Sequence, residues 1–106
     1  MAYDIMFSAL GDNTRHTVFE RLRRGPQTVS ALAAGLPVSR PAISQHLKVL
    51  REAGLVAIQA EGTRRLYRID GPGLCGLKDY LQVVWSEAAA AHEAEVARQL
   101  EERRYG

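Results

Sequence analysis

The chain has 106 residues, of which 46% are hydrophobic and 25% are charged, and this composition is typical of one small folded domain with a single core. Its lone cysteine, Cys75, excludes an internal disulfide and any zinc site built from several cysteines. No basic leader precedes an apolar run, and no apolar run approaches membrane length, so we expect a cytoplasmic protein without a membrane partner.

The net charge of +2 hides an uneven distribution along the chain. The segment from Arg15 to Arg68 has ten basic and three acidic residues, a net charge of +7, whereas the two flanking segments together carry −5. A basic middle between acidic ends indicates a polyanion as the partner of the middle. Random scatter of charge over a solvated surface is the alternative, and charge alone leaves both readings open.

Three helices are predicted in the first third of the chain. Residues 3–10 form a short apolar helix, and residues 11–25 form a second helix that Asp12 caps and Gly25 ends. The alanine-rich segment 28–37 forms a third, shorter helix, because alanine lets neighbouring elements approach closely. The apolar stripe of the second helix consists of Val18, Phe19 and Leu22.

The segment "VSRPAISQHLKVLREAGLV" predicts a fourth helix over residues 39–53. Ser39 caps it, a proline lies in its first turn, and Gly54 stops it. The residues that point inward, at steps of four and three, are Ile43, Leu47 and Leu50. The residues of the opposite face, an unusual mixture for a surface that needs only solubility, are Arg40, Pro41, Ser44, Gln45 and Lys48.

After this helix the pattern changes from helical to alternating. Residues 55–69 predict a two-stranded hairpin whose tip is the "EGT" of residues 61–63. Glycine and proline at 71–73 make a break. A long helical pattern runs from Leu74 onward, and the helix that carries it is placed within residues 72–103. Its apolar positions recur at three- and four-residue steps, as in a coiled-coil seam. The seam residues are Leu74, Leu77, Leu81, Val84, Ala88 and Ala91.

The expected fold is therefore mostly α with a small β-hairpin, in the order ααααββα, and forms a single domain over residues 1–106. A short helix, a tight turn and a capped second helix make a helix-turn-helix, and the hairpin directly after it makes this motif winged. The long seam has no obvious partner in so short a chain, and its most economical partner is a second copy across a two-fold axis. The alternative is that the helix folds back on its own domain, which we expect for the part near Leu74.

These features resemble the ArsR/SmtB family of bacterial repressors. Residues 9–69 are similar to the core of that family, and the pattern S-x-P-x-x-S-x-H-L-x-x-L-R-x-x-G-L-V over residues 39–56 is its most specific part. Asn13 departs from the proline that relatives often have after the capping aspartate. The resemblance implies a homodimeric repressor that inserts the second helix of the motif into the major groove of a palindromic operator and dimerises through its first and last helices.

The predicted DNA contacts follow from side-chain chemistry. Gln45 suits bidentate pairing with adenine, Arg40 and Lys48 suit phosphate or guanine, and Pro41 suits a thymine methyl group. The hairpin tip suits phosphate or the minor groove. Arg15 is a weaker candidate, with bracing of helix packing as its alternative. The full predicted set is Ser39, Arg40, Pro41, Ser44, Gln45, His46 and Lys48 on the helix, with Thr63, Arg64 and Arg65 on the hairpin; for His46 a structural hydrogen bond is an equal alternative.

No metal site or other sensor is predicted. The third helix lacks cysteines, and on the last helix Asp79, His92 and Glu95 reproduce a known ligand spacing with Leu81 in place of a histidine. A lost nitrogen ligand leaves that site incomplete. For Cys75 a small buried apolar residue is preferred over a redox sensor. The residues that a small apolar effector would contact are Tyr80, Val83 and Trp85, although interface packing explains them better.

No arrangement of histidine, cysteine or glycine indicates an enzyme or a cofactor site. Two alternatives to a simple DNA-binding repressor stay open. One is a metal-responsive repressor that uses the last helix. The other is a winged helix that binds proteins, although that role does not require Arg40, Lys48 and the two hairpin arginines on one side.

Overall fold

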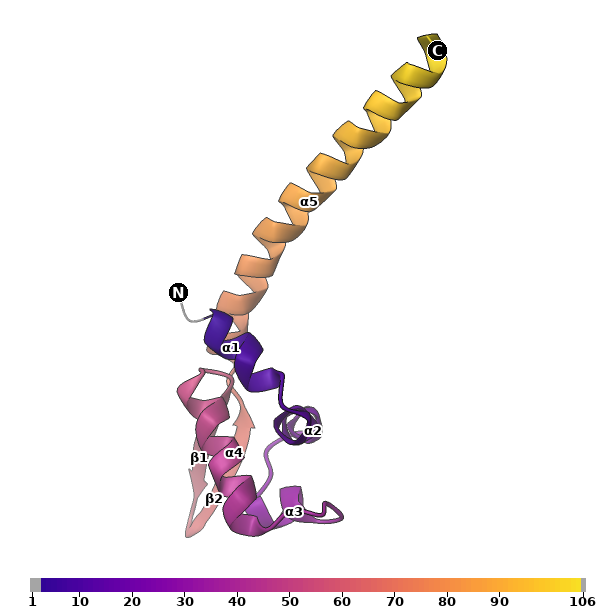
Figure 1. The fold of residues 1–106 in the computed structure, drawn as a ribbon. Helices are drawn as coiled ribbons and strands as arrows, with labels where there is room; N and C mark the ends of the chain where they lie inside the picture. Colours follow the sequence, from indigo (N-terminus) through magenta and orange to yellow (C-terminus); the bar gives the residue numbers. More distant parts are fainter. Residues whose placement is uncertain (1–2, 106) are drawn as a thin grey trace. The chain divides into compact units, whose positions relative to one another are not determined.

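A computed structural model describes residues 3–105, with side chains through residue 104. In chain order the elements are α1 (Tyr3–Leu10), α2 (Asn13–Leu22), α3 (Val29–Ala33), α4 (Arg40–Glu52), β1 (Val56–Glu61), β2 (Arg64–Ile69) and α5 (Gly71–Tyr105) (Figure 1). This order confirms the predicted ααααββα arrangement with its winged helix-turn-helix. The chain divides into two compact units between Leu74 and Cys75, inside α5.

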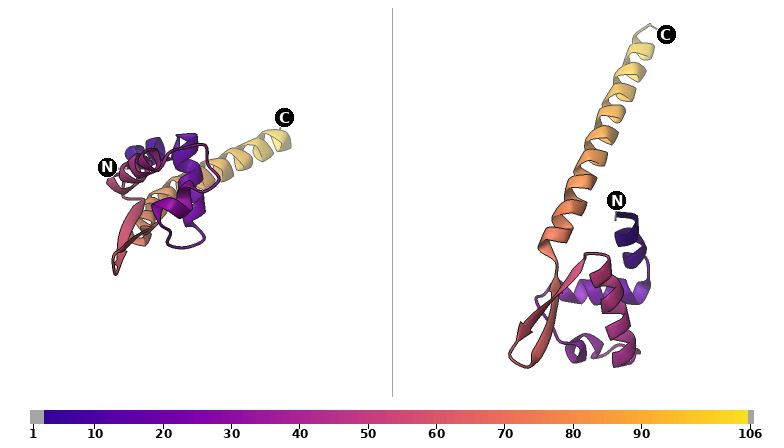
Figure 2. Two further views of the ribbon diagram at one scale, coloured as in Figure 1. Left: turned by 90° about the horizontal axis from the view of Figure 1, so that it is seen from below. Right: turned by 90° about the vertical axis from the view of Figure 1, so that its left-hand side faces the viewer.

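The core of the first unit is built around α4, which contacts α1, α2, α3 and β1. Figure 2 shows α2 and α4 crossing, with α3 beside them and the hairpin to one side. Every element up to the hairpin contributes buried apolar residues, so a single hydrophobic core holds these elements together. The largest fully buried side chains are Val18, Leu22, Leu32, Ile43, Leu47, Leu50 and Leu55.

Side chains cap the starts of α2 and α3; the cap at Asp12 is predicted from the sequence, and the cap at Thr28 is not. The Asp12 carboxylate accepts a hydrogen bond of 3.0 Å from the backbone N–H of Arg15, and the Thr28 hydroxyl accepts one of 3.2 Å from Ala31. The predicted end of α2 at Gly25 is wrong by three residues. The helix ends at Leu22, and Gly25 follows in the turn, where its positive φ of 131° is easily adopted by glycine.

The hairpin pairs β1 with β2 in antiparallel register, from Val56 opposite Ile69 to Glu61 opposite Arg64. Its turn therefore consists of Gly62 and Thr63 alone, one residue shorter than the predicted tip. Gly62 has a φ of 62° and Thr63 has no positive φ, which is the pattern of a type II′ turn with glycine first.

A third segment, not predicted from the sequence, joins the hairpin. The backbone N–H of Gln27 donates to the carbonyl of Tyr67 at 2.9 Å, and the N–H of Tyr67 donates back to the carbonyl of Gln27 at 2.8 Å. This reciprocal pair makes an isolated antiparallel bridge to β2. The chain between α2 and α3 is thus fixed to the hairpin.

The predicted break at residues 71–73 is wrong, because these residues form the first turn of α5. Asp70 provides the cap: its carboxylate accepts from the N–H of Gly73 at 3.1 Å, and its carbonyl accepts from Leu74 at 3.0 Å. Pro72 is acceptable there because first-turn N–H groups have no partner within the helix. A Cβ on Gly73 would lie 1.8 Å from the carbonyl oxygen of Gly54, so only glycine fits this approach.

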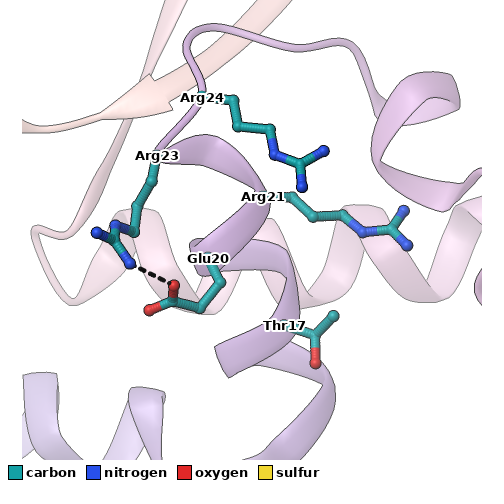
Figure 3. A pocket seen from close by; sticks show the side chains of 5 residues that line it. All are labelled: Thr17, Glu20, Arg21, Arg23 and Arg24. Atoms are coloured by element: carbon teal, nitrogen blue, oxygen red, sulfur yellow. Dashed lines mark hydrogen bonds and ion pairs between the residues drawn. The ribbon is translucent and has the colours of Figure 1, made fainter.

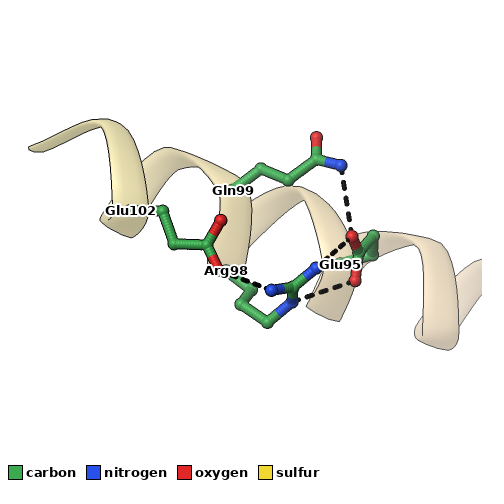
Figure 4. Close-up of polar contacts among 4 residues, drawn as sticks. All are labelled: Glu95, Arg98, Gln99 and Glu102. Atoms are coloured by element: carbon green, nitrogen blue, oxygen red, sulfur yellow. Dashed lines mark hydrogen bonds and ion pairs between the residues drawn. The ribbon is translucent and has the colours of Figure 1, made fainter. Parts of the chain in front are cut away.

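The second unit is the rest of α5, from Cys75 onward. Apart from Leu77, its large apolar side chains are exposed: Tyr80, Leu81, Val83, Val84, Trp85, Val96 and Leu100. Near its end the Arg98 guanidinium contacts Glu95 at 2.6 Å and Glu102 at 2.5 Å, and Gln99 donates to Glu95 at 3.1 Å (Figure 4). Among the described residues, no helix is long and apolar enough to cross a membrane.

The close approach of Gly73 to Gly54 generates a stability prediction. Gly73→Ala should lower the free energy of unfolding by about 1–3 kcal/mol, because the added methyl group overpacks against main chain that has no flexible side chain to move. Gly71→Ala is the matched control, since a Cβ there meets no atom within 4 Å. Urea denaturation of both variants measures the difference. Equal stability of the two variants would contradict the close approach.

Candidate nucleic-acid interface

One face of α4 is fully buried and the other is open to solvent. Ile43, Leu47 and Leu50 have exposures of 0%. The exposed residues are Ser39, Arg40, Pro41, Ser44, Gln45 and Lys48. The Ser39 hydroxyl accepts a hydrogen bond of 3.3 Å from the N–H of Ala42, and Pro41 lies in the first turn. The helix therefore presents its polar side chains on one outward surface, called here the α4 polar face.

His46 is the exception among the predicted helix residues, because it is half-buried. Asp12, the capping residue of α2, has a carboxyl pKa below its usual value. The hydrogen bond from the N–H of Arg15 is the main cause that lowers the pKa of the Asp12 carboxyl, and the charges of Arg15 and His46 lower this pKa further. For His46 the structural role and the DNA contact both stay predictions.

The hairpin tip places its three predicted residues in solvent. Thr63 belongs to the two-residue turn, and Arg64 and Arg65 are the first residues of β2. Both arginines are exposed, whereas the next two residues, Leu66 and Tyr67, are buried. The tip thus combines two exposed cations with a base whose side chains are buried in the core.

Arg15 has a bracing role in the structure. Its Nε donates a hydrogen bond of 2.8 Å to the carbonyl oxygen of Ala9, near the C-terminal end of α1. A cation at the C-terminal end of a helix satisfies unpaired carbonyls and is favoured by the helix dipole. This contact links α1 to α2 and supports the bracing alternative over a DNA contact.

A polar hollow of about 480 Å³ lies along the C-terminal half of α2, lined by Thr17, Glu20, Arg21, Arg23 and Arg24. Figure 3 shows that Arg23 turns toward Glu20, at 2.8 Å, while the guanidinium of Arg21 points the other way. The Nη1 atom of Arg21 donates to the carbonyl oxygens of Leu32 at 3.0 Å and Ala34 at 2.6 Å. In the sequence Arg21 counts only as positive charge, because its acceptors are backbone atoms with no sequence signal.

The ligands of the alternative metal site lie on the last helix. Among residues 3–104, no group of three or more histidine, cysteine, aspartate or glutamate side chains could hold a metal ion. Glu95 belongs to the network of Arg98 and Gln99, and the hydrogen bond from Arg98 is the main cause that lowers the pKa of its carboxyl. Glu95, one of the ligands that the alternative metal site requires, is therefore already bonded to Arg98 and Gln99.

Two further predictions concern α5. The expectation that Cys75 is buried is wrong: the thiol is exposed, because it lies off the apolar seam of the helix. A shallow apolar hollow of about 320 Å³ is lined by Trp85, Ala88, Ala89, His92 and Glu93. Of the residues predicted to contact an effector, only Trp85 lines this hollow, while Tyr80 and Val83 do not.

A capped helix with an exposed polar face, packed against a shorter helix and followed by a basic hairpin, defines a winged helix-turn-helix protein. Residues 12–57 match the family described as "Bacterial regulatory protein, arsR family". The HTH-type transcriptional regulator Rv2034 of Mycobacterium tuberculosis is 48% identical over 89 residues, which cover 84% of this chain and 83% of the relative. The chain belongs to the arsR family of bacterial regulatory proteins.

Two solved structures agree with this assignment. An ArsR-like transcriptional regulator from Rhodococcus sp. RHA1 superimposes with a TM-score of 0.76 at 35% identity, covering 88% of each chain. A DNA-binding domain of Mb0332 from Mycobacterium bovis, described as a homodimeric winged helix-turn-helix, gives a TM-score of 0.64 at 31% identity over 81% of this chain and 80% of that one. These likenesses confirm the predicted fold and the prediction of a transcriptional regulator.

The cap of α4 generates a second stability prediction. Ser39→Ala should lower the free energy of unfolding by about 0.5–2 kcal/mol, because the N–H of Ala42 loses its side-chain acceptor. Ser39→Asn is the matched control, since asparagine caps helices as well as serine does. Urea denaturation compares the three proteins. If both variants lose the same stability, the hydroxyl does not act as a cap.

Proposed function

We propose that the protein is a homodimeric transcriptional repressor that binds a palindromic DNA operator through the major groove. The exposure of the α4 polar face over a completely buried apolar face carries this proposal. A helix that enters the major groove needs short side chains for close approach and donors or acceptors at base edges. Ser44 and Gln45 satisfy both needs, and Arg40 and Lys48 flank them with positive charge.

The proposed DNA contacts are of two kinds. Some read the base sequence, and the others hold the DNA backbone. Gln45 is the residue best suited to a base, through two hydrogen bonds to adenine, with Ser44 beside it. Thr63, Arg64 and Arg65 at the hairpin tip are suited to phosphates or the minor groove, which fix orientation more than they read sequence. In this proposal residues 39–53 are the recognition helix and residues 55–69 are the wing.

Exposed apolar surface on the first and last helices supports dimerisation. Ile5 and Phe7 of α1 are exposed, and the seam residues Leu81 and Val84 of α5 have exposures of 45% and 42%. Such surface is rarely left open by a monomeric protein. The relative described as homodimeric has the same fold, which supports a second copy as the partner.

The seam also indicates which part of α5 forms the interface. Continued beyond Ala91 in the same heptad register, the seam positions are Glu95, Arg98 and Glu102, the charged residues of the network in Figure 4. Charged residues that pair within one helix do not need a partner helix. Within the proposed dimerisation helix of residues 72–103, we therefore assign the apolar contact to Leu74–Ala91.

The alternatives have less support. A metal-responsive repressor would need Glu95 to leave Arg98, and a protein-binding module would not need a polar face bounded by Arg40 and Lys48. The proposed role is regulatory and not enzymatic, as in the family to which the chain belongs. A repressor of chromosomal DNA acts in the bacterial cytoplasm, and occupation of a promoter by a dimer is its simplest mechanism.

Base reading by Gln45 gives a binding prediction. On an operator selected from a random DNA pool, Gln45→Ala should weaken binding by about 1–3 kcal/mol and relax the preference at one base pair in each half-site. The half-sites should lie about one helical turn apart, roughly 34–36 Å. Fluorescence anisotropy at fixed salt measures the affinities.

Gln82→Ala, an exposed substitution on α5, is the control and should bind like the parent. Unchanged affinity and discrimination in both Gln45→Ala and Ser44→Ala would reject the α4 polar face as the reading surface.

Dimerisation gives a further prediction. Leu81→Glu or Val84→Glu should raise the dimer dissociation constant by about two orders of magnitude or more, because each change buries a charge against its symmetry mate. Sedimentation velocity over a concentration series measures it. Ser86→Glu adds the same charge on the opposite side of α5 and should leave the dimer intact. A monomeric parent at high micromolar concentration would refute the proposed assembly.

A further inference from the structure

A continuous set of hydrogen bonds joins the hairpin to the helix-turn-helix through two side chains, those of Arg21 and Gln27. The main chain of Gln27 is bonded to Tyr67 of β2 in both directions, at 2.9 and 2.8 Å. The Nε2 atom of Gln27 donates to the carbonyl oxygen of Arg21. The guanidinium of Arg21 in turn donates to the carbonyls of Leu32 and Ala34, at 3.0 and 2.6 Å.

The guanidinium of Arg21 contacts α3, a helix that needs contacts from other elements to be stable. α3 has only five residues, a length at which a helix is marginal without outside contacts. Arg21 satisfies two carbonyls at its C-terminal end, where a cation is also favoured by the helix dipole. At its N-terminal end, α3 is capped by Thr28, the residue directly after Gln27. Both ends of α3 are therefore fixed by the same short stretch of chain.

The position of α3 bears directly on the recognition helix. Only residues 34–39 separate the end of α3 from the start of α4, so a shift of α3 changes where α4 begins. At the other end of the network, Tyr67 follows Arg65 by two residues on β2 and has its side chain buried. The strand that carries the tip arginines is thus bonded to Gln27 two residues after Arg65.

We propose that Arg21 and Gln27 form a polar clamp that fixes the wing relative to the recognition helix, and that they are positioning residues for DNA binding without touching DNA. This inference rests on the proposed function. Two contact surfaces on one rigid body can meet a helix and a backbone at once, because no ordering cost falls on binding. A wing that moves independently of α4 would hold the phosphates less well.

The surroundings favour a clamp over an anion site in the hollow of Figure 3. The described contacts of Arg21 go to neutral carbonyls, and Arg23 is paired with Glu20 inside the same hollow. A carboxylate there opposes binding of an anion. The hydrogen bonds of Arg21 and Gln27 are thus made within the protein. They connect the wing to α3, the helix that precedes the recognition helix.

Gln27→Ala tests the clamp because it removes the side-chain bond without changing the net charge. Hydrogen exchange, measured on the free protein, should show the Tyr67 amide exchanging about ten-fold faster, while the Leu50 amide in α4 keeps its rate. On the selected operator the dissociation constant should rise about ten-fold. The slope of log affinity against log salt should become shallower by about one unit for each phosphate that the wing no longer binds.

Two further variants separate positioning from general loss of stability. Val18→Ala weakens the core and leaves the clamp intact, so it should lower stability without changing the salt slope. Arg21→Lys keeps the charge but ends in a shorter side chain than the one whose Nη1 atom donates to both carbonyls, and should fall between the parent and Gln27→Ala. It also provides a readout if Gln27→Ala does not fold.

Each outcome bears on one part of the proposal. Unchanged exchange of Tyr67 in both clamp variants overturns the clamp itself. Faster exchange with parental affinity and salt slope overturns its positioning role in DNA binding. A parent protein that selects no duplex from the random pool overturns the proposed function and the positioning role with it, whereas the exchange rates still decide whether the pair fixes the wing.

Discussion

The complete burial of one face of α4 is the constraint on which the rest of the structure depends. Ile43, Leu47 and Leu50 have no exposed surface, and α1, α2, α3 and β1 are arranged around them. Burial of these three side chains contributes on the order of 1.5–3 kcal/mol each, enough to decide which way the helix faces. This burial sets the rotation of α4 about its own axis. Ser44, Gln45 and Lys48 must then face solvent.

Polar contacts stabilise this arrangement at the ends of the helices. Arg15 joins α2 to the end of α1, Arg21 joins it to the end of α3, and Asp70 starts α5 beside the end of α4. Each of these bonds satisfies backbone groups at a helix terminus, where the helix itself provides no partner. Part of the positive charge of residues 15–68 therefore stabilises the fold, and the remainder, on α4 and the hairpin tip, is available to a polyanion.

Much of the fold could be predicted because its signals are local. Asp12 and Ser39 mark helix starts, the spacing of Ile43, Leu47 and Leu50 gives the buried face of α4, and alternation gives the hairpin. The bridge from Gln27 to Tyr67 and the acceptors of Arg21 involve backbone atoms distant in the sequence, which residue types do not report. The errors at the end of α2, the start of α5 and Cys75 are local, at helix ends and on a helix face. The α4 polar face was predictable for the same reason as its buried face, since one period determines both.

The exposed Trp85 on α5 has a consequence for spectroscopy. It is the sole tryptophan of the chain, and 72% of its surface is open to solvent in the protomer. Its emission wavelength therefore reports the surroundings of α5. Burial of this side chain by a second copy would shift the emission to shorter wavelength, so the fluorescence of one sample on dilution can follow self-association.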